Sequence, residues 1–407
     1  MKFEFLPAFK GDCFFIHAGT DAKPVLILVD GGPGGTYQNH LRPRLMELRD
    51  ERGLDPFTPL VIDLVIVSHV DDDHINGILG LFREIRQAVL ANDPPLFQVN
   101  GLWHNSFDEI IGNNQITAEA AQFGAASFAP MTEEAEGQEE FDAGLILQSI
   151  SQGNELRDLA LSMELNIPLN DGFGGLIKTA NDKLTKRDVG GITFTVIGPR
   201  TDELAELQEE HDKWLKEQKA KGKPITPGSM LQAMSDESVA NLSSIVLLAE
   251  RGSRRALLTG DARGDFILKG AEEIGLVKAG KPLKVDLLKM PHHGSDRNVD
   301  MPFLKRVPAA QYLFTGNGEH GNPERETFRM LESARPGTAM EFYLTYKIAA
   351  IDPEREKTHE KERQKAIKKG KTPRPKWSSS KDGLKPLFDT FPNSIKVVEP
   401  TGPAVKL

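Results

Sequence analysis

The sequence is poor in cysteine and contains no long uninterrupted apolar stretch. Its 407 residues include a single cysteine, Cys13, which excludes an internal disulfide framework and a zinc site built from cysteines. No run of about 18 apolar residues is present, so we expect no membrane-spanning helix. Glu4, Lys10 and Asp12 interrupt the apolar positions at the start of the chain, which argues against a secretory signal. These absences predict a cytoplasmic protein that has no membrane contact.

Charge is unevenly distributed along the chain. The formal net charge is −9, yet Pro353–Lys376 holds ten lysines and arginines against four glutamates, which leaves about −15 on the remainder. Because an acidic body does not attract polyanions as a whole, any nucleic-acid contact is expected to be local. The basic segment predicts a solvated helix with a flexible end, and nucleic-acid binding is the alternative.

Short apolar runs alternate with helical patterns over most of the chain, which predicts a layered α/β fold. The expected strands are Lys2–Pro7, Cys13–His17, Val25–Val29, Pro59–Val67, Ile192–Ile197, Val285–Lys289, Gln311–Phe314 and Ser394–Val398, together with a hairpin formed by Ser243–Ala249 and Arg255–Leu258. The expected helices are Tyr37–Arg52, Gly77–Leu90, Leu156–Leu165 and Glu324–Ala334.

Two stretches are less regular and predict insertions, at about residues 105–188 and 201–228. The first contains an acidic segment, Thr132–Glu140. The second contains a helical stripe of Leu204, Leu207, His211, Trp214 and Leu215.

Residues of the types that commonly bind metals, histidine and aspartate, follow several of the expected strands. They are Asp30, the cluster from His69 to His74, Asp261, and the pair His292 and His293. Ligands in layered α/β folds bind beyond strand ends, so these positions can converge. Three carboxylates and three imidazoles suffice for two divalent ions: Asp71, Asp73, Asp261, His69, His74 and either His292 or His293, with Asp261 as the bridge.

Less specific explanations exist for parts of this pattern. The acidic residues before Ile75 are also typical of a helix N-cap, although capping does not explain the flanking histidines. Gly31–Gly35 lacks the spacing of a dinucleotide-binding loop and predicts a tight turn. His104 follows a strand-like run and is either an ordinary hydrogen-bonding histidine or part of the site wall.

Three motifs occur together and in a fixed order: VSHVDDDHINGI, LLTGDA and KMPHHGS. In this order they resemble the metallo-β-lactamase-fold hydrolases, and most of all the branch containing the soluble hydrolase domain of the competence DNA-uptake protein ComEC. The resemblance implies a four-layer αββα fold over residues 1–345, interrupted by the helical insertions. Residues 346–407 would then be a basic, charged extension with a returning strand at 394–398.

The resemblance also implies roles for individual residues. His69 and Asp71 would hold one metal, and Asp73, His74 and the first histidine of the HHGS motif, His292, the other. Asp261 would bridge the two ions and Asp30 would support the ligand loop. His293 would face the substrate, and His293 or His320 would protonate the leaving group. Supporting or substrate-binding positions would be Ser295, Asn317 and Asn322.

Two departures from the family pattern change the expectation. Asp71 stands where most of the superfamily has histidine, and this hard oxygen ligand moves the expected metal from zinc toward manganese or magnesium without excluding zinc. The usual third-motif histidine is replaced by Gly198-Pro199-Arg200, so the first metal would be held loosely or bind only with substrate.

These observations favour a metal-dependent hydrolase that attacks with a metal-bound hydroxide, with two divalent ions (Mn, Zn or Mg), acting as a phosphodiesterase or nuclease. Hydrolysis of a small phosphodiester or other ester is the alternative enzyme. A non-catalytic module of a multi-protein system is the alternative of another class, docking through the charged segments Thr201–Pro224 and Pro353–Lys376.

Overall fold

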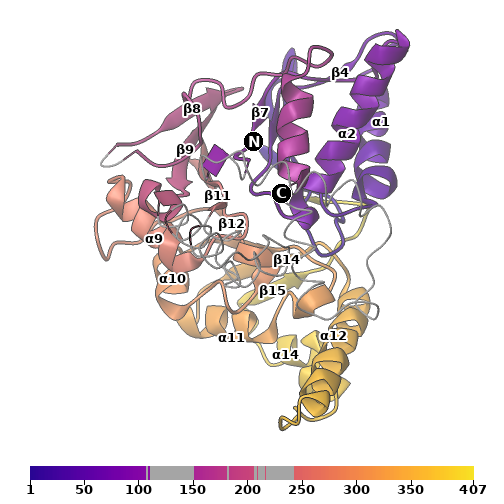
Figure 1. The fold of residues 1–407 in the computed structure, drawn as a ribbon. Helices are drawn as coiled ribbons and strands as arrows, with labels where there is room; N and C mark the ends of the chain where they lie inside the picture. Colours follow the sequence, from indigo (N-terminus) through magenta and orange to yellow (C-terminus); the bar gives the residue numbers. More distant parts are fainter. Residues whose placement is uncertain (107–108, 111–150, 181–182, 206–208, 210–215, 217–242) are drawn as a thin grey trace.

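The computed structural model describes residues 1–106, 109–110, 151–180, 183–205, 209, 216 and 243–407 (Figure 1). The acidic segment Thr132–Glu140, four positions of the expected stripe (Leu207, His211, Trp214 and Leu215) and most of Thr201–Pro224 lie outside the described residues. Among the described helices, none is both long and apolar enough to cross a membrane.

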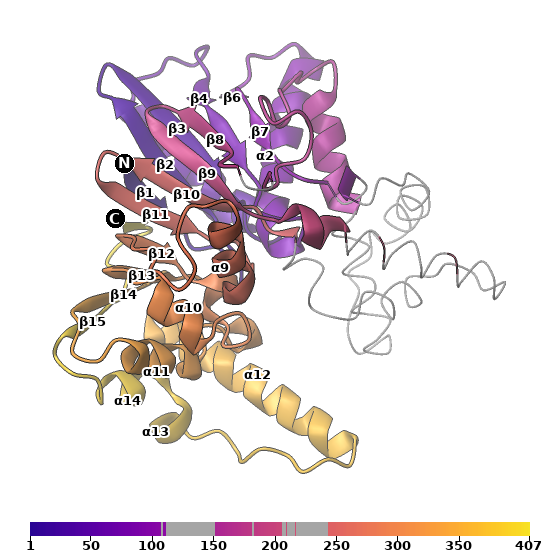
Figure 2. The same ribbon diagram turned by 90° about the vertical axis from the view of Figure 1, so that its left-hand side faces the viewer.

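The described residues form a mixed α/β structure with two large sheets (Figure 2). The first, of six described strands, has the order β16 (Val405–Lys406), β1 (Lys2–Phe5), β2 (Phe14–Thr20), β3 (Lys23–Val29), β5 (Leu64–Ile66) and β7 (Leu102–Trp103). Pairing is antiparallel from β16 to β3 and parallel from β3 to β7. A separate parallel pair consists of β4 (Leu60–Ile62) and β6 (Phe97–Val99).

The second large sheet has eight described strands. Their order is β15 (Ile395–Val398), β14 (Met340–Leu344), β13 (Gln311–Phe314), β12 (Leu287–Lys289), β11 (Arg254–Leu258), β10 (Val246–Arg251), β9 (Ile192–Gly198) and β8 (Lys186–Val189). Strands β11 to β15 are parallel, whereas β8 to β11 pair antiparallel. The expected hairpin is therefore confirmed as β10–β11.

Helices flank both sheets. Those described are α1 (Arg42–Glu51), α2 (Asp72–Ala91), a helix over residues 151–161, α9 (Gly264–Glu273), α10 (Met301–Arg306), α11 (Arg325–Ala334), α12 (Ile348–Lys368), α13 (Ser379–Asp382) and α14 (Leu384–Phe388). Single turns also occur at η1 (Tyr37–Leu41), η2 (Pro291–Gly294) and η3 (Glu319–Gly321).

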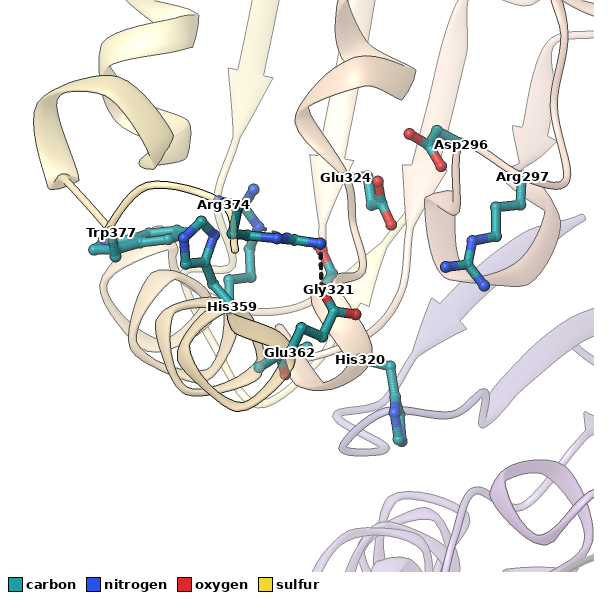
Figure 3. Close-up of a pocket in the computed structure, with 11 residues that line it drawn as sticks. Asp296, Arg297, His320, Gly321, Glu324, His359, Glu362, Arg374 and Trp377 are labelled. Carbon is teal, nitrogen blue, oxygen red and sulfur yellow. Dashed lines mark hydrogen bonds and ion pairs between the residues drawn. The ribbon is translucent and has the colours of Figure 1, made fainter. Parts of the chain in front are cut away.

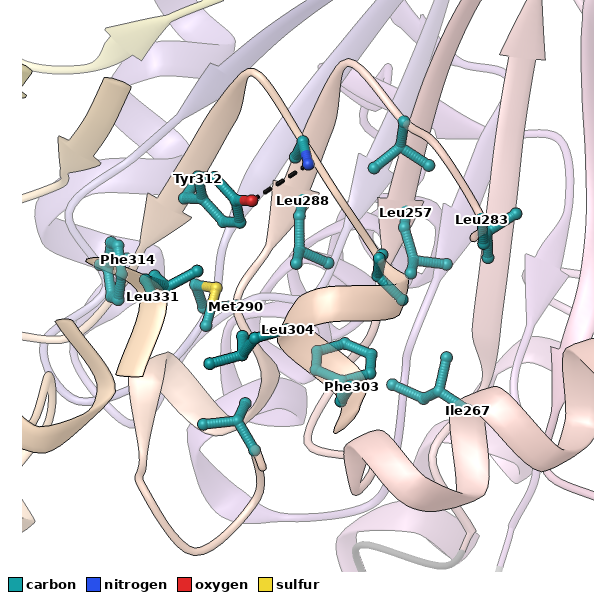
Figure 4. Close-up of a cluster of buried hydrophobic side chains, with 14 of the residues drawn as sticks. Leu257, Ile267, Leu283, Leu288, Met290, Phe303, Leu304, Tyr312, Phe314 and Leu331 are labelled. Carbon is teal, nitrogen blue, oxygen red and sulfur yellow. Dashed lines mark hydrogen bonds between the residues drawn. The ribbon is translucent and has the colours of Figure 1, made fainter. Parts of the chain in front are cut away.

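Three buried apolar clusters hold these elements together. One lies between the two sheets and combines, for example, Ile27 and Ile66 with Leu247 and Leu258. A second joins the other side of the first sheet to α1 and α2. The third joins the second sheet to α9, α10 and α11, where Leu257, Leu288 and Phe303 meet (Figure 4).

The continuous apolar strands follow from this double burial. In β3, Ile27 faces the cluster between the sheets, while Leu26 and Leu28 face α1 and α2. In β11, Leu258 faces the first sheet and Leu257 faces the helices. Because successive side chains of a strand point to opposite faces, a strand buried on both sides must be apolar throughout.

The expected strand Pro59–Val67 is two strands in different sheets. Asp63 separates β4 from β5, and its Oδ2 accepts a 2.8 Å hydrogen bond from the backbone N–H of Leu26. The apolar pattern was continuous enough to conceal this break, because both short strands are buried.

The segment after residue 345 contributes to both sheets. β15 pairs with β14, as a parallel edge strand of the second sheet, and β16 pairs with β1 of the first. The basic helix is α12, which begins at Ile348, before Pro353. The division into residues 1–345 and 346–407 stays a prediction.

A buried carboxylate on β1 supports a prediction about stability. Glu4 is 2% exposed, and its carboxylate accepts hydrogen bonds from Arg44 Nε and His17 Nε2, each at 2.7 Å. Burial alone would raise the pKa of Glu4, but these partners outweigh it and lower the pKa from 4.5 to about 2.

Because the pKa of Glu4 is lower in the folded than in the unfolded protein, the ionised carboxylate stabilises the fold above pH 4.5. This stabilisation is lost as the pH falls toward 2. We therefore expect Glu4→Gln to lower the free energy of unfolding at neutral pH by roughly 3 kcal/mol, and by progressively less in acid. Urea unfolding at several pH values measures this. Glu47→Gln removes an exposed partner of the same arginine and should change stability little; an equal loss in both variants would contradict the argument.

Candidate metal centre

The chemical residues singled out in the sequence converge where strands of both sheets end. The first sheet supplies Asp30 after β3 and the segment from His69 to His74 after β5. The second supplies Asp261 after β11 and the histidine pair after β12. The strand-end pattern therefore predicted correctly that these distant segments meet.

Two overlapping groups of side chains have the composition and spacing of a metal site. One comprises Asp12, His74, Asp261 and His293, all buried; the other comprises His69, Asp73 and His74. Within each group the candidate ligand atoms lie within 4.8 Å of one another. Two ligand atoms, each about 2.1 Å from one ion, stand roughly 3–4 Å apart, so the spacing fits coordination.

Buried carboxylates orient two of the imidazoles. Asp30 accepts hydrogen bonds from the N–H and Oγ–H of Ser68, at 2.7 and 2.8 Å, and its Oδ2 lies 2.9 Å from His74 Nδ1. Asp12 Oδ1 lies 3.1 Å from His293 Nδ1. A carboxylate only accepts, so each Nδ1 carries the hydrogen and each Nε2 is directed at the group. Carboxylates that accept the Nδ1 hydrogen of a histidine commonly orient its other nitrogen toward a metal in this way.

The nitrogen atoms that face the centre are buried and lack hydrogen bonds. Nε2 of His69, His74 and His293, and Oδ1 of Asp261, have no hydrogen-bond partner among the described residues. Leaving such an atom unsatisfied costs about 1–3 kcal/mol. Shared cations would satisfy all four atoms at once, so the residues present fit a divalent metal.

Asp261 lies between two sets of ligand atoms. Its Oδ2 is 3.7 Å from the Nε2 atoms of both His69 and His292, and its Oδ1 is 3.4 Å from His74 Nε2. On one side Asp71 Oδ2 is 3.4 Å from His69 Nε2. Asp261 Oδ2 also lies 3.7 Å from His293 Nε2, so this one carboxylate faces four imidazoles, which suits a bridging ligand.

The remaining carboxylate of the cluster lies on the other side. Asp73 Oδ2 is 3.6 Å from His293 Nε2, and Asp73 Oδ1 is 4.0 Å from His74 Nε2.

Electrostatic coupling within the group is strong. Burial alone would raise the pKa of Asp261, but the imidazoles, foremost His292 and His74, outweigh it and hold this pKa well below its usual range. Burial alone would lower the pKa of His293, yet Asp261 and Asp12 raise it to about 9. A proton on His293 therefore helps to balance the carboxylates, and a divalent ion would displace it on binding.

Two residues of the centre were not anticipated from the sequence. Asp12 lies in the turn between β1 and β2, and Lys289, at the end of β12, is 1% exposed. Lys289 Nζ forms an ion pair with Asp12 and donates a 2.9 Å hydrogen bond to the carbonyl of Gly260. The sequence held one indication of this pair: Lys289 lies within the apolar run that precedes the HHGS motif. Lysine is rarely buried without a partner, so an acidic residue was to be expected beside it.

The histidine pair adopts an arrangement that differs from the expected one. His293, assigned to the substrate, belongs to the buried group, whereas His292, assigned to the metal, is 35% exposed at its rim. Both have positive φ, 47° for His292 and 56° for His293, so the backbone turns sharply between them. This turn, which sequence order does not reveal, is what buries the second histidine.

The other predicted positions surround the group. His320 is exposed in η3, and Asn317 hydrogen-bonds to Glu319. The amide of Asn322 donates to the carbonyl of His292 at 3.2 Å, and Ser295 is buried directly after η2.

Two positions are occupied by structural contacts. His104 is buried, and its Nε2 lies 3.1 Å from the carbonyl of Gly153. Arg200, at the position of the missing third-motif histidine, is buried and forms ion pairs with Glu203 and Glu273.

Comparison with known proteins identifies no family for this chain. No family model and no curated protein matches it. Solved structures with partial similarity include CmlA, a diiron β-hydroxylase from Streptomyces venezuelae (TM-score 0.34, 11% identity, 100% of this chain and 54% of that one). Another is a β-lactamase domain protein from Burkholderia ambifaria (0.28, 14%, 95% and 81%). A third, from Parabacteroides distasonis, is named as a metal-dependent hydrolase (0.31, 10%, 84% and 97%). The chain thus spans about half the length of CmlA. Similarity this low assigns neither family nor activity.

Close backbone approaches fix the ligand loops, which gives a prediction at Gly77. The N–H of Gly77 donates to the carbonyl of Gly32, and a Cβ at Gly77 would lie 1.9 Å from the carbonyl oxygen of Gly31. Alanine normally stabilises a helix by about 1 kcal/mol over glycine. Here we expect destabilisation instead. Gly77→Ala should lower the free energy of unfolding by roughly 2 kcal/mol or more, because the backbone at Gly31 must move to admit the added methyl group. Gly101→Ala, where the nearest atom is 3.6 Å away, is the control for chemical denaturation.

The bridging position of Asp261 predicts the metal content. Wild-type protein dialysed against manganese or zinc should retain the ion and show a raised melting temperature, since binding favours the folded state. Asp261→Asn should lose both effects, because the amide is a poor ligand for either ion. Asp72→Asn is the matched control, since Asp72 lies between two predicted ligands but hydrogen-bonds to Asn76 and Gln152. Elemental analysis showing equal metal in wild type and Asp261→Asn would refute the assignment.

Proposed function

We propose that this chain is a two-metal phosphodiesterase, with a nuclease as its most specific form. The observation that carries the proposal is the buried Asp261 carboxylate, which faces the Nε2 atoms of His69 and His74, neither of which has a hydrogen-bond partner among the described residues. The motifs that resemble the ComEC hydrolase branch support the same reading.

The fold belongs to the proposal as well. The three apolar clusters are consistent with layers in the order helix, sheet, sheet, helix. We therefore infer a four-layer αββα metallo-β-lactamase fold, in which the centre lies at one edge of the paired sheets.

The donor atoms divide into two ligand sets that share Asp261. His69, Asp71 and His292 would hold one ion, while Asp73, His74 and His293 would hold the other. Divalent ions bound there would neutralise phosphate charge and lower the pKa of water. Two of the six unshared ligands, Asp71 and Asp73, are carboxylates, and the shared Asp261 is a third; this composition suits manganese or magnesium and tolerates zinc.

The surrounding residues hold the ligands and move protons. Asp30 and Asp12 keep the hydrogen of His74 and His293 on Nδ1, and Lys289 compensates the buried charge of Asp12. His293 is committed to the buried group, which leaves exposed His320 as the better candidate for holding a proton near the leaving oxygen.

Cleavage assays test the proposal. Purified protein with manganese should cleave single- or double-stranded DNA or RNA, and the double variant Asp73→Ala/His74→Ala should reduce cleavage to the level seen with chelator. Asp72→Ala should remain active. Small chromogenic phosphodiesters assayed in parallel separate the alternatives, because cleavage confined to them would favour a small-molecule esterase. Absence of metal-dependent cleavage of every substrate, or cleavage unaffected in the double variant, would overturn the proposal.

A further inference from the structure

A cavity lies beside the candidate metal centre. None of the proposed metal ligands lines it. Its volume is about 320 Å³, within the usual range of small-ligand pockets (Figure 3). The walls come from the loop after η2, from η3, from α12 and from the segment that follows α12; the residues used below are Asp296, His320, Glu324, His359, Arg374 and Trp377.

Hydrogen bonds connect the wall of the cavity to the loop that carries the histidine pair. Asp296 follows that loop directly, and the N–H of Glu324 donates to the carbonyl of Gly294 at 3.1 Å. Thr327 Oγ1 donates to the same carbonyl at 2.8 Å. A ligand in the cavity would therefore lie beside the metal group, with exposed His320 at their boundary.

One wall of the cavity presents aromatic surface. His359 on α12 meets Trp377 edge to face, with ring centroids 5.4 Å apart, and Trp377 is only partly buried. Figure 3 shows both rings on the side of the cavity opposite Asp296. An unpaired base can stack on such a surface whatever its identity.

The facing wall carries groups suited to the polar edge of a base. Burial, together with a hydrogen bond shared with Asp296, raises the pKa of Glu324 to about 7. Near neutral pH this pair both donates and accepts. Three arginines and three acidic residues line the cavity, and Arg355 and Arg374 are already paired with Asp352 and Glu362, so the cavity has no excess of positive charge for a phosphate.

Positive charge is concentrated instead along the exposed side of α12 and just beyond it. Lys365, Lys368, Lys369 and Lys371 are all exposed, and α12 extends away from the body (Figure 2). Arg355 fixes the helix to the cavity wall, because its Nε donates to the carbonyl of Gly321. Lysines spaced along a helix can bind successive phosphates of one strand.

We propose that the cavity is a base-binding subsite for single-stranded nucleic acid, with Trp377 as the stacking surface and the lysines of α12 as contacts for the flanking phosphates. This inference rests on the proposed function and narrows its substrate to a polynucleotide. In this proposal the segment after residue 345 takes part in substrate binding. The cavity binds a base, and the lysines of α12 bind the phosphates.

Binding can be measured without turnover. Fluorescence anisotropy of a labelled single-stranded DNA oligonucleotide, with the full chain in EDTA, reports affinity independently of metal and cleavage. We expect Trp377→Ala to weaken binding about tenfold or more and Trp377→Phe to restore most of it. The triple variant Lys365→Gln/Lys368→Gln/Lys369→Gln should weaken binding and reduce the slope of log affinity against log salt by about two.

A triple variant of equal charge is the control. Lys278, Lys281 and Lys284 are exposed on the segment that leads into β12 and so lie toward the strand end opposite the metal group. Lys278→Gln/Lys281→Gln/Lys284→Gln should bind as wild type. Unfolding midpoints of all variants show whether they are folded.

Three results would overturn the subsite: wild-type affinity in Trp377→Ala, an equal loss in the control triple, or equal competition by a duplex of the same sequence. Failure of the proposed function is distinguishable, because oligonucleotide binding in EDTA that responds to Trp377 would persist without any metal-dependent cleavage. Conversely, cleavage of a small diester together with Trp377-independent oligonucleotide binding would retain the phosphodiesterase and reject the subsite.

Discussion

The carboxylate of Asp261 joins ligand groups that two separate sheets deliver. His69 and His74 follow a strand of the first sheet, whereas His292 and His293 follow a strand of the second, and all four have Nε2 atoms directed toward this one side chain. Because Asp261 itself follows β11 of the second sheet, His69 and His74 can approach its carboxylate only when the two sheets are packed together. The centre therefore depends on the apolar cluster between the sheets, and that cluster in turn must tolerate a charged group at its edge.

Much of this arrangement follows from local sequence. A strand buried on both faces is apolar throughout, so the strands before Asp30, His69 and Asp261 stood out, and the polar residues at their ends marked the site. The helix expected over Gly77–Leu90 was also predictable, although it begins five residues earlier, at Asp72, within the ligand motif itself. Here one acidic run forms both the first turn of a helix and part of the candidate metal group.

Other features depend on contacts that sequence alone does not contain. Asp12 resembles an ordinary turn residue until the fold brings it to Lys289 and His293, more than 270 positions away. The order of His292 and His293 depends on backbone angles that favour glycine but are adopted here by two histidines. Pro59–Val67 looked like one strand because burial, not pairing, determines its composition. In each case the deciding interaction is nonlocal.

The pairing of β1 with β16 has a consequence for how the protein folds. The N–H groups of Phe3 and Leu407 each donate to the other residue's carbonyl, at 2.8 and 2.9 Å, so the outer edge of β1 is completed by β16. During synthesis β1 emerges about 400 residues before its partner β16. Until then β1 offers an unpaired edge to other chains, which is the usual route to association through strands. Closure of this sheet edge is thus a long-range folding event, which cannot occur until about 400 further residues have been made.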